Sequence, residues 1–145
     1  MTYVFGLVTE ATPQRVWAVL TTPELTAQYL SGLGARSTWR PGSSVSLEAI
    51  GQPGAPSLTV GGEVLAAEEP TRLSYTLTAG RDQPTTYVTW EVIADGAGAA
   101  IRLSVDEPDE LTSGVPLQET QEVWSQVVAR LASVLARSVS RPSPA

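Results

Sequence analysis

The segment that most constrains the fold of this chain is Leu117 to Ser138, LQETQEVWSQVVARLASVLARS, which has the pattern of one long amphipathic helix. Its apolar residues recur at steps of three and four and therefore share one helical face: Trp124, Val127, Val128, Leu131, Val134 and Leu135. Polar residues such as Glu122 and Arg130 fall on the opposite face. Because an amphipathic helix is only marginally stable alone in water, this one needs a large apolar partner surface.

The partner surface is a β-sheet, because most of the chain between Ala35 and Asp106 alternates between apolar and polar residues. The expected strands are Ala35 to Trp39, Ser44 to Ile50, a strand from Ser57, Arg72 to Thr78, a strand around Thr86 to Ile93, and one around Ile101 to Val105. In the strand from Ser57, Val64 and Ala66 are expected to share a face, and Gly61-Gly62 to form a bulge or bend. Asp95-Gly96 predicts a hairpin turn.

A further strand, Tyr3 to Thr9, opens the chain and is followed by two helix start signals. Thr12-Pro13 and Thr22-Pro23 each place an N-cap residue before a proline at the first helical position. Two short helices are therefore expected, with Trp17 as a core residue of the first. The stretch from Ser31 to Gly34 is expected to end the second.

This order of elements predicts an α+β fold in one domain, residues 1–139, with a flexible tail at 140–145. A curved antiparallel sheet of about six to seven strands would wrap around the long C-terminal helix, with the two short helices after the first strand. A single helix about 10 Å across cannot fill the concave side of such a sheet. The sequence therefore predicts an apolar cavity between the helix and the sheet.

Composition removes several classes of chemistry. The chain has no His and no Cys, and all nine of its basic residues are Arg, so thiolate catalysis, disulfides, imidazole catalysis and Schiff-base chemistry are excluded. No metal and no cofactor are expected. A net charge of −6 argues against nucleic acid as a partner. No apolar run is long enough for membrane insertion, so a cytoplasmic protein is expected.

Several short motifs, in their order along the chain, resemble a known family. They are Ala11 to Trp17, Leu20 to Glu24, Trp39 to Gly42, Gly62 to Val64, Glu69 to Leu73, the strand around Val88 to Val92, and the C-terminal helix with Trp124 near its start. Together they resemble the START-like (SRPBCC) superfamily, which includes the birch pollen allergen-like proteins, and within it the subfamily of activators of heat-shock-chaperone ATPase (Aha type). The resemblance covers nearly the whole chain. It implies a helix-grip fold whose hydrophobic cavity holds a lipid, a sterol, a polyketide or another apolar molecule.

The candidate ligand-binding residues are those expected to face the cavity from the sheet, the helix and the entrance: Tyr29, Tyr75, Val88, Trp90, Leu103, Trp124, Val128 and Leu131. Trp90 and Trp124 are expected to face each other across it. The hydroxyl of Tyr75 either has a protein or water partner or orients a ligand. The acidic stretch from Asp106 to Glu110 lacks the ligand spacing of a calcium loop and is interpreted as solvated.

Three functions remain open from the sequence. The first is non-catalytic binding of a small hydrophobic ligand, to which the resemblance adds a stress-related role. The second is an enzyme of the cyclase, aromatase or hydrolase type that uses the same cavity. The third is an interaction module with a chaperone or another protein as partner. The chain is compatible with a monomer or a homodimer, and one fold can serve all three functions.

Overall fold

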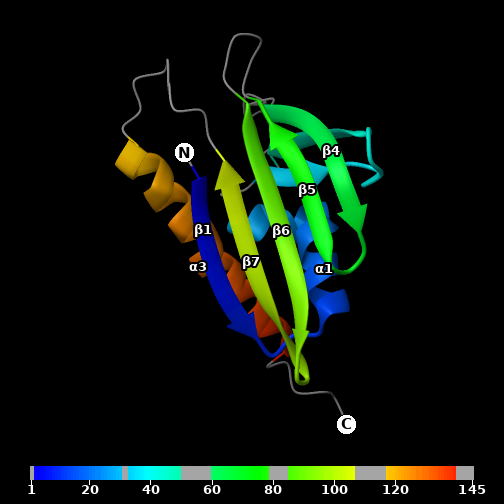
Figure 1. The fold of residues 1–145 in the computed structure, drawn as a ribbon, viewed down its shortest axis with the longest axis vertical. Helices are drawn as coiled ribbons and strands as arrows, with labels where there is room; N and C mark the ends of the chain where they lie inside the picture. The colour runs from blue at the N-terminus through cyan, green and yellow to red at the C-terminus, as the bar shows by residue number, and fades with distance from the viewer. Residues whose placement is uncertain (1, 31–32, 50–59, 79–84, 107–116, 140–145) are drawn as a thin grey trace.

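The sheet and the helices form two layers in the computed structural model, which describes residues 2–30, 33–49, 60–78, 85–106 and 117–139. The elements are β1 (Thr2–Thr9), α1 (Pro13–Thr21), α2 (Pro23–Tyr29), β2 (Leu33–Arg36), β3 (Ser44–Ala49), β4 (Val60–Glu68), β5 (Arg72–Leu77), β6 (Thr86–Asp95), β7 (Gly98–Asp106) and α3 (Leu117–Val139). The helices lie on one side of the sheet (Figure 1). This is the expected α+β arrangement, with α3 covering the predicted span almost residue for residue.

The sheet is antiparallel throughout, in the order β1-β7-β6-β5-β4-β3-β2. From β2 to β7 each strand pairs with the next in the chain, and β1 adds to the free side of β7. In this register Trp90 lies opposite Leu103, and Tyr75 lies opposite Val88. Side chains on one face of an antiparallel pair meet at directly opposed positions. The register therefore gathers the inward residues of β5, β6 and β7 on one face.

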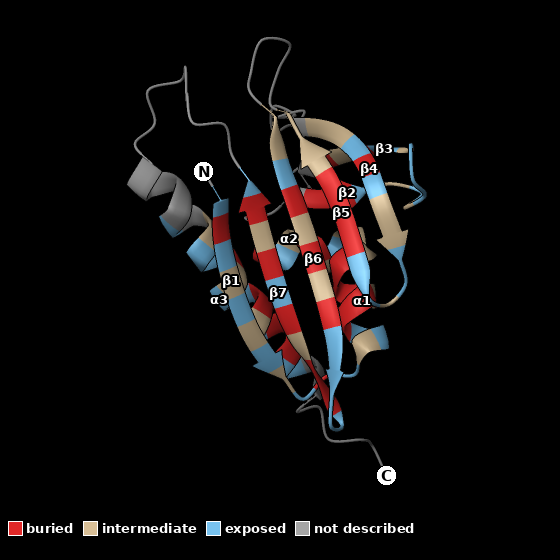
Figure 2. Cartoon of the chain, in the orientation of Figure 1, coloured by how far each residue is buried: buried red, intermediate tan, exposed pale blue. Residues whose placement is uncertain are grey.

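Buried positions alternate with intermediate or exposed ones along the central strands, as Figure 2 shows for β6 and β7. The inward residues of these two strands are Val88, Trp90, Val92, Ile101, Leu103 and Val105, all buried. The predicted helix stripe supplies the opposing layer, since Val127, Leu131, Val134 and Leu135 of α3 are also buried. Helix α3 packs against β1 and α2, whereas α1 packs against β6 and β7. The core therefore lies between the three helices and the concave face of the sheet.

The two threonine-proline signals both start helices, but by different means. At α1 the Thr12 side chain accepts a hydrogen bond of 3.2 Å from the backbone N–H of Arg15. At α2 no side-chain capping bond forms from Thr22. Instead, the buried Thr26 within α2 accepts a hydrogen bond of 2.8 Å from the N–H of Ala35. This bond ties the short helix to β2.

The strand predicted at Ala35 to Trp39 is placed differently. Strand β2 spans Leu33–Arg36, so it begins within the stretch expected to end α2 and stops three residues before Trp39. Trp39 has a backbone φ of 54°, in the left-handed region that a strand cannot use. Its N–H bonds to the hydroxyl oxygen of Ser37, at 3.0 Å, rather than to a strand partner. A local side-chain bond therefore replaces the strand ladder here.

Strand β4 contains the predicted irregularity, but at another place. The register shifts between Val64 and Ala66, which leaves Leu65 as the extra residue of a bulge. Beyond the shift Ala67 lies opposite the buried Leu73 and packs against the core, so the prediction that Ala66 shares the inward face of Val64 is wrong. The extra residue reverses the alternation.

Gly62 has a separate role from the bulge. A Cβ at this position would overlap the carbonyl oxygen of Thr76, so only glycine permits this approach of β4 to β5. Asp106, which was expected to begin the acidic loop, is instead the last residue of β7. The rest of that loop and the tail at 140–145 lie outside the described residues. None of the described helices is long and apolar enough to cross a membrane.

Candidate functional site

Four aromatic side chains form a continuous series on the concave side of the sheet: Trp39, Tyr75, Trp90 and Tyr29. Trp39 and Tyr75 meet edge to face, with ring centroids 6.0 Å apart. Tyr75 is joined to Trp90 by a hydrogen bond, and Trp90 meets Tyr29 edge to face at 6.3 Å. Both ring contacts have the T-shaped geometry that aromatic pairs favour. Three of the four residues come from different strands or helices, so the series crosses the core.

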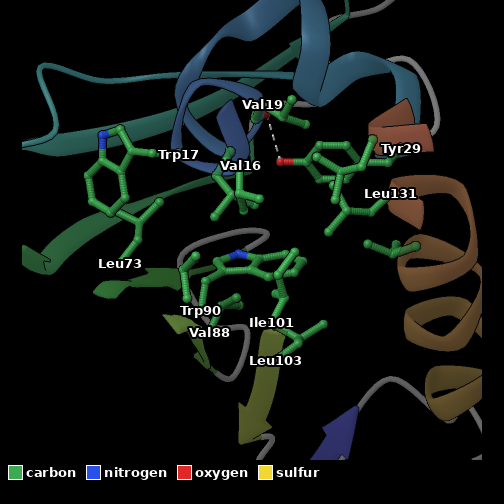
Figure 3. Packing of buried hydrophobic residues seen from close by; sticks show 14 of the residues in the cluster. Val16, Trp17, Val19, Tyr29, Leu73, Val88, Trp90, Ile101, Leu103 and Leu131 are labelled. Atoms are coloured by element: carbon green, nitrogen blue, oxygen red, sulfur yellow. Dashed lines mark hydrogen bonds between the residues drawn. The ribbon is translucent and has the colours of Figure 1, made fainter. Parts of the chain in front are cut away.

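Trp90 lies at the centre of this core. Figure 3 shows its ring between Val16 of α1 and Val88 of its own strand, with Leu131 of α3 to one side. Only 1% of its surface is exposed. Its indole N–H, the one polar group of the side chain, donates a hydrogen bond of 3.1 Å to the Tyr75 hydroxyl. A buried indole usually finds such a partner.

Tyr29 reaches the core from α2, whose last helical residue it is. Its hydroxyl donates a hydrogen bond of 3.3 Å to the backbone carbonyl of Val19 in α1, the dashed line in Figure 3. Burial, and secondarily the nearness of Tyr75, raise the pKa of the Tyr29 phenol well above its ordinary value. This phenol is therefore neutral, and its proton is already used within the protein.

Tyr75 differs from Tyr29 in how its hydroxyl is used. The oxygen accepts the bond from Trp90, but no acceptor for the phenolic proton occurs in the part of the chain that the structure describes. Burial raises the pKa of this phenol to about 12, and the bond from Trp90 offsets only part of that effect. Tyr75 thus keeps its proton at neutral pH. It offers a buried hydrogen-bond donor.

Trp39 forms the outer end of the series and was not among the candidate residues. Its indole N–H donates to the carbonyl of Thr21 at 3.0 Å, and its side chain is only partly buried. A bulky residue with φ of 54° carries strain of about 1–3 kcal/mol, which the surrounding contacts must offset. Left-handed non-glycine residues concentrate at functional sites. The sequence does not predict this backbone conformation, because contacts with residues elsewhere in the chain stabilise it.

The remaining candidate residues fall into two groups. Val88, Leu103 and Leu131 pack around Trp90 with at most 1% of their surfaces exposed. Trp124 and Val128 of α3 are partly exposed at the border of this cluster, as are Phe5 and Leu7 of β1. A closely packed centre therefore adjoins a border where apolar surface is still open to solvent.

The described core offers hydroxyls but no charges. Apart from tyrosine, the buried polar residues among those described are Thr26 and Ser74, of which Ser74 lies on the outer face of β5 opposite Thr89, and all seven described arginines are exposed. No group of three or more acidic side chains among the described residues is arranged to hold a metal ion. Such a site can bind by apolar contact and by hydrogen bonds from a phenol. It supplies no charge to balance a charged ligand.

A curled seven-stranded antiparallel sheet, with two short helices after its first strand and a long helix after its last, defines the helix-grip fold of the START-like (SRPBCC) superfamily. Within it, the chain belongs to the family described as activator of Hsp90 ATPase homolog 1-like protein. The family pattern matches residues 10–136. This confirms the resemblance drawn from the sequence motifs.

Solved structures share the fold at low sequence identity. A protein from Mesorhizobium loti has a TM-score of 0.77 at 21% identity, covering 95% of this chain and 98% of its own. One from Chromobacterium violaceum has a TM-score of 0.71 at 19% identity, covering 92% and 96%. Ara h 8.0201 has a TM-score of 0.72 at 16% identity, covering 97% and 99%. No curated protein sequence matches the chain.

Proposed function

We propose that this protein binds a small, predominantly apolar molecule between α3 and the concave face of the sheet, without catalysing a reaction on it. The observation that carries the proposal is the border of partly exposed apolar side chains on two packed elements, Phe5 and Leu7 of β1 and Trp124 and Val128 of α3. Partly exposed apolar side chains beside a buried core are typical of ligand sites. The helix-grip fold supports the same proposal.

Binding at the centre of the site would require side chains to move. Val88, Trp90, Leu103 and Leu131 are closely packed, with at most 1% of each exposed. A ligand that displaces them binds only the fraction of molecules that is open, and its apparent affinity falls by that fraction. We therefore expect modest affinity, with the first contacts made at Trp124 and Val128.

The test is titration with a neutral apolar fluorophore, N-phenyl-1-naphthylamine. We expect the wild-type protein to bind it and Trp124→Ala to weaken the binding about tenfold or more, since loss of an aromatic anchor commonly costs above ~1.4 kcal/mol. Arg102→Ala, on the outer face of the sheet, is the matched control and should leave the dissociation constant unchanged. If the two substitutions weakened binding equally, the ligand would not bind at the α3 border. A wild-type protein that does not bind the fluorophore would overturn the proposal.

A mass spectrum of the purified protein under non-denaturing conditions gives a second, independent test. A mass excess that disappears on denaturation would identify a co-purified ligand and would report the number of subunits. The lipid, polyketide or other class of the ligand would follow from that mass difference. If neither the wild type nor Trp124→Ala carries a mass excess, the fluorophore titration decides whether the protein binds an apolar ligand.

One observation favours a second function, contact with a protein partner through the outer face of the sheet. Val8 and Ile93 are 72% and 59% exposed and lie on either side of Ala100 across β1, β7 and β6. Exposed apolar residues that adjoin one another can mark an interaction surface. Because the family is described by activation of the Hsp90 ATPase, purified Hsp90 is the partner to test. Binding that is lost in Val8→Ser/Ile93→Ser but kept in Trp124→Ala would support this function.

A further inference from the structure

One buried polar group in the site has an unused bonding capacity. The Tyr75 side chain is 4% exposed, and its hydroxyl accepts the hydrogen bond from Trp90. A phenol can also donate one hydrogen bond, and within residues 2–30, 33–49, 60–78, 85–106 and 117–139 no acceptor receives it. Buried donors without a partner are rare in native proteins and are unfavourable. An acceptor from outside the described chain would satisfy this one.

The neighbouring groups fix the direction in which Tyr75 can donate. Trp90 occupies the acceptor side of the Tyr75 oxygen, so the phenolic proton must point away from the indole. Tyr29, the other buried phenol of the series, already donates to the carbonyl of Val19. Trp39 covers the Tyr75 ring edge to face and gives its own N–H to Thr21. Of these four aromatic groups, only Tyr75 has a proton left to donate.

Charge in the surroundings limits which acceptors fit. Among the residues whose side chains the structure describes, no Arg, Asp or Glu is buried, and the seven arginines are exposed. A carboxylate or phosphate brought to Tyr75 would lose its hydration without gaining a counter-ion, which is strongly unfavourable. A neutral carbonyl oxygen loses much less hydration free energy than a carboxylate or phosphate does. One hydrogen bond from a phenol replaces the hydrogen bonds to water that it loses.

We propose that Tyr75 donates a hydrogen bond to the carbonyl oxygen of a neutral apolar ligand, such as a ketone or an ester, with Trp90 holding the hydroxyl in position. This inference rests on the proposed binding function and adds the chemical class of the ligand. Apolar contact supplies most of the affinity, and Tyr75 selects a carbonyl compound over the corresponding hydrocarbon and carboxylate. The selection is modest because one neutral hydrogen bond contributes about 0.5–1.5 kcal/mol, or roughly two- to tenfold in affinity.

The test compares three matched compounds as competitors of bound N-phenyl-1-naphthylamine: 9-fluorenone, fluorene and fluorene-9-carboxylate. The first two differ only in a carbonyl against a methylene group. We expect the wild type to bind fluorenone roughly two- to tenfold more tightly than fluorene, and the carboxylate most weakly. Tyr75→Phe should remove the preference for fluorenone over fluorene. Tyr87→Phe, at an exposed position on the outer face of β6, is the control, and the preference should persist in it.

A spectroscopic measurement keeps the proposal testable if Tyr75→Phe folds poorly. Hydrogen bonding lowers the carbonyl stretching frequency, so fluorenone bound to the wild type should absorb at a lower wavenumber than fluorenone in an alkane. An unshifted carbonyl band, or equal affinities for fluorenone and fluorene, would overturn the role of Tyr75 while leaving apolar binding in place. Absence of fluorophore binding by the wild type would instead overturn the binding function, and the inference with it.

Discussion

Trp90 donates a hydrogen bond of 3.1 Å to the hydroxyl of Tyr75, although the two residues are not directly opposed in the sheet. Trp90 of β6 faces Leu73, and Tyr75 of β5 faces Val88, so the bond runs diagonally between neighbouring inward positions. Diagonal neighbours in a sheet lie within reach of long aromatic side chains. The bond satisfies the indole N–H and leaves the phenolic proton available. It thereby links the packing of the core to its binding chemistry.

A double-mutant cycle measures this bond. Tyr75→Phe leaves the Trp90 N–H buried without an acceptor, so we expect it to lower the free energy of unfolding by about 1–3 kcal/mol. Trp90→Phe removes the donor, and Tyr75→Phe should cost about 1 kcal/mol less in that background. Urea denaturation of the four proteins provides the free energies. Additive losses would show that the two groups are not coupled.

The buried phenols predict a loss of stability at alkaline pH. The pKa of Tyr75 is about 12 in the folded protein against 10.0 for an unperturbed tyrosine, so its contribution is complete below pH 10.0 and is lost as the pH rises toward 12. For Tyr75 alone this corresponds to about 2 kcal/mol between about pH 9 and about pH 11.5. The raised pKa of Tyr29 acts in the same direction. Denaturation at the two pH values should show a smaller decrease for Tyr75→Phe, and an identical decrease would contradict the assignment.

Two adjacent glycines offer a matched pair of substitutions. A Cβ at Gly62 would overlap the backbone carbonyl of Thr76, whereas a Cβ at Gly61 would lie 3.6 Å from the carbonyl oxygen of Val45, an ordinary contact. We expect Gly62→Ala to lower the free energy of unfolding by about 1–3 kcal/mol or more, since the backbones of β4 and β5 must separate. Gly61→Ala should change it by less than about 0.5 kcal/mol. Equal losses would contradict the close approach of β4 and β5.

The two helix starts give a second matched pair. The Thr12 side chain caps α1, while Thr22 makes no side-chain capping bond at α2. Thr12→Ala should therefore lower the free energy of unfolding by about 1 kcal/mol, a typical value for the loss of an N-cap. Thr22→Ala should have a clearly smaller effect. Thermal unfolding followed by circular dichroism distinguishes the two variants, and a larger loss in Thr22→Ala would contradict the assignment of the caps.

The sequence predicted the central strands and α3 well because each of these elements has one apolar face and one polar face. In β5 the alternation of Leu73 and Tyr75 with polar residues specifies the inward face, and the stripe on α3 is equally distinct. The pattern was ambiguous in β4, where Leu65, Ala66 and Ala67 are all apolar and small changes of register have a low cost. The bulge depends on how β4 pairs with β5, and the local sequence of β4 carries no information about that pairing.

Tertiary contacts explain what was missed in the site. Tyr75 and Trp90 were expected to face inward, but their hydrogen bond depends on the register between β5 and β6. The edge contact between Tyr29 and Trp90 depends on how α2 docks on the core. Trp39 joins the series through its ring contact with Tyr75 and its hydrogen bond to Thr21, which depend on how distant segments pack together. None of these contacts produces a periodic pattern of residues, so none could be predicted from the sequence.

The pairing of β1 with β7 has a consequence for synthesis in the cell. A hydrogen bond from Thr2 to Asp106 spans 104 positions along the chain. At roughly 5–20 residues per second, a ribosome needs roughly 5 to 20 s after making the start of β1 to complete the strand that receives it. During this interval Thr2–Thr9, which contains no charged residue, has no sheet partner. Nascent chains of this protein therefore carry a strand suited to capture by chaperones until β7 is complete.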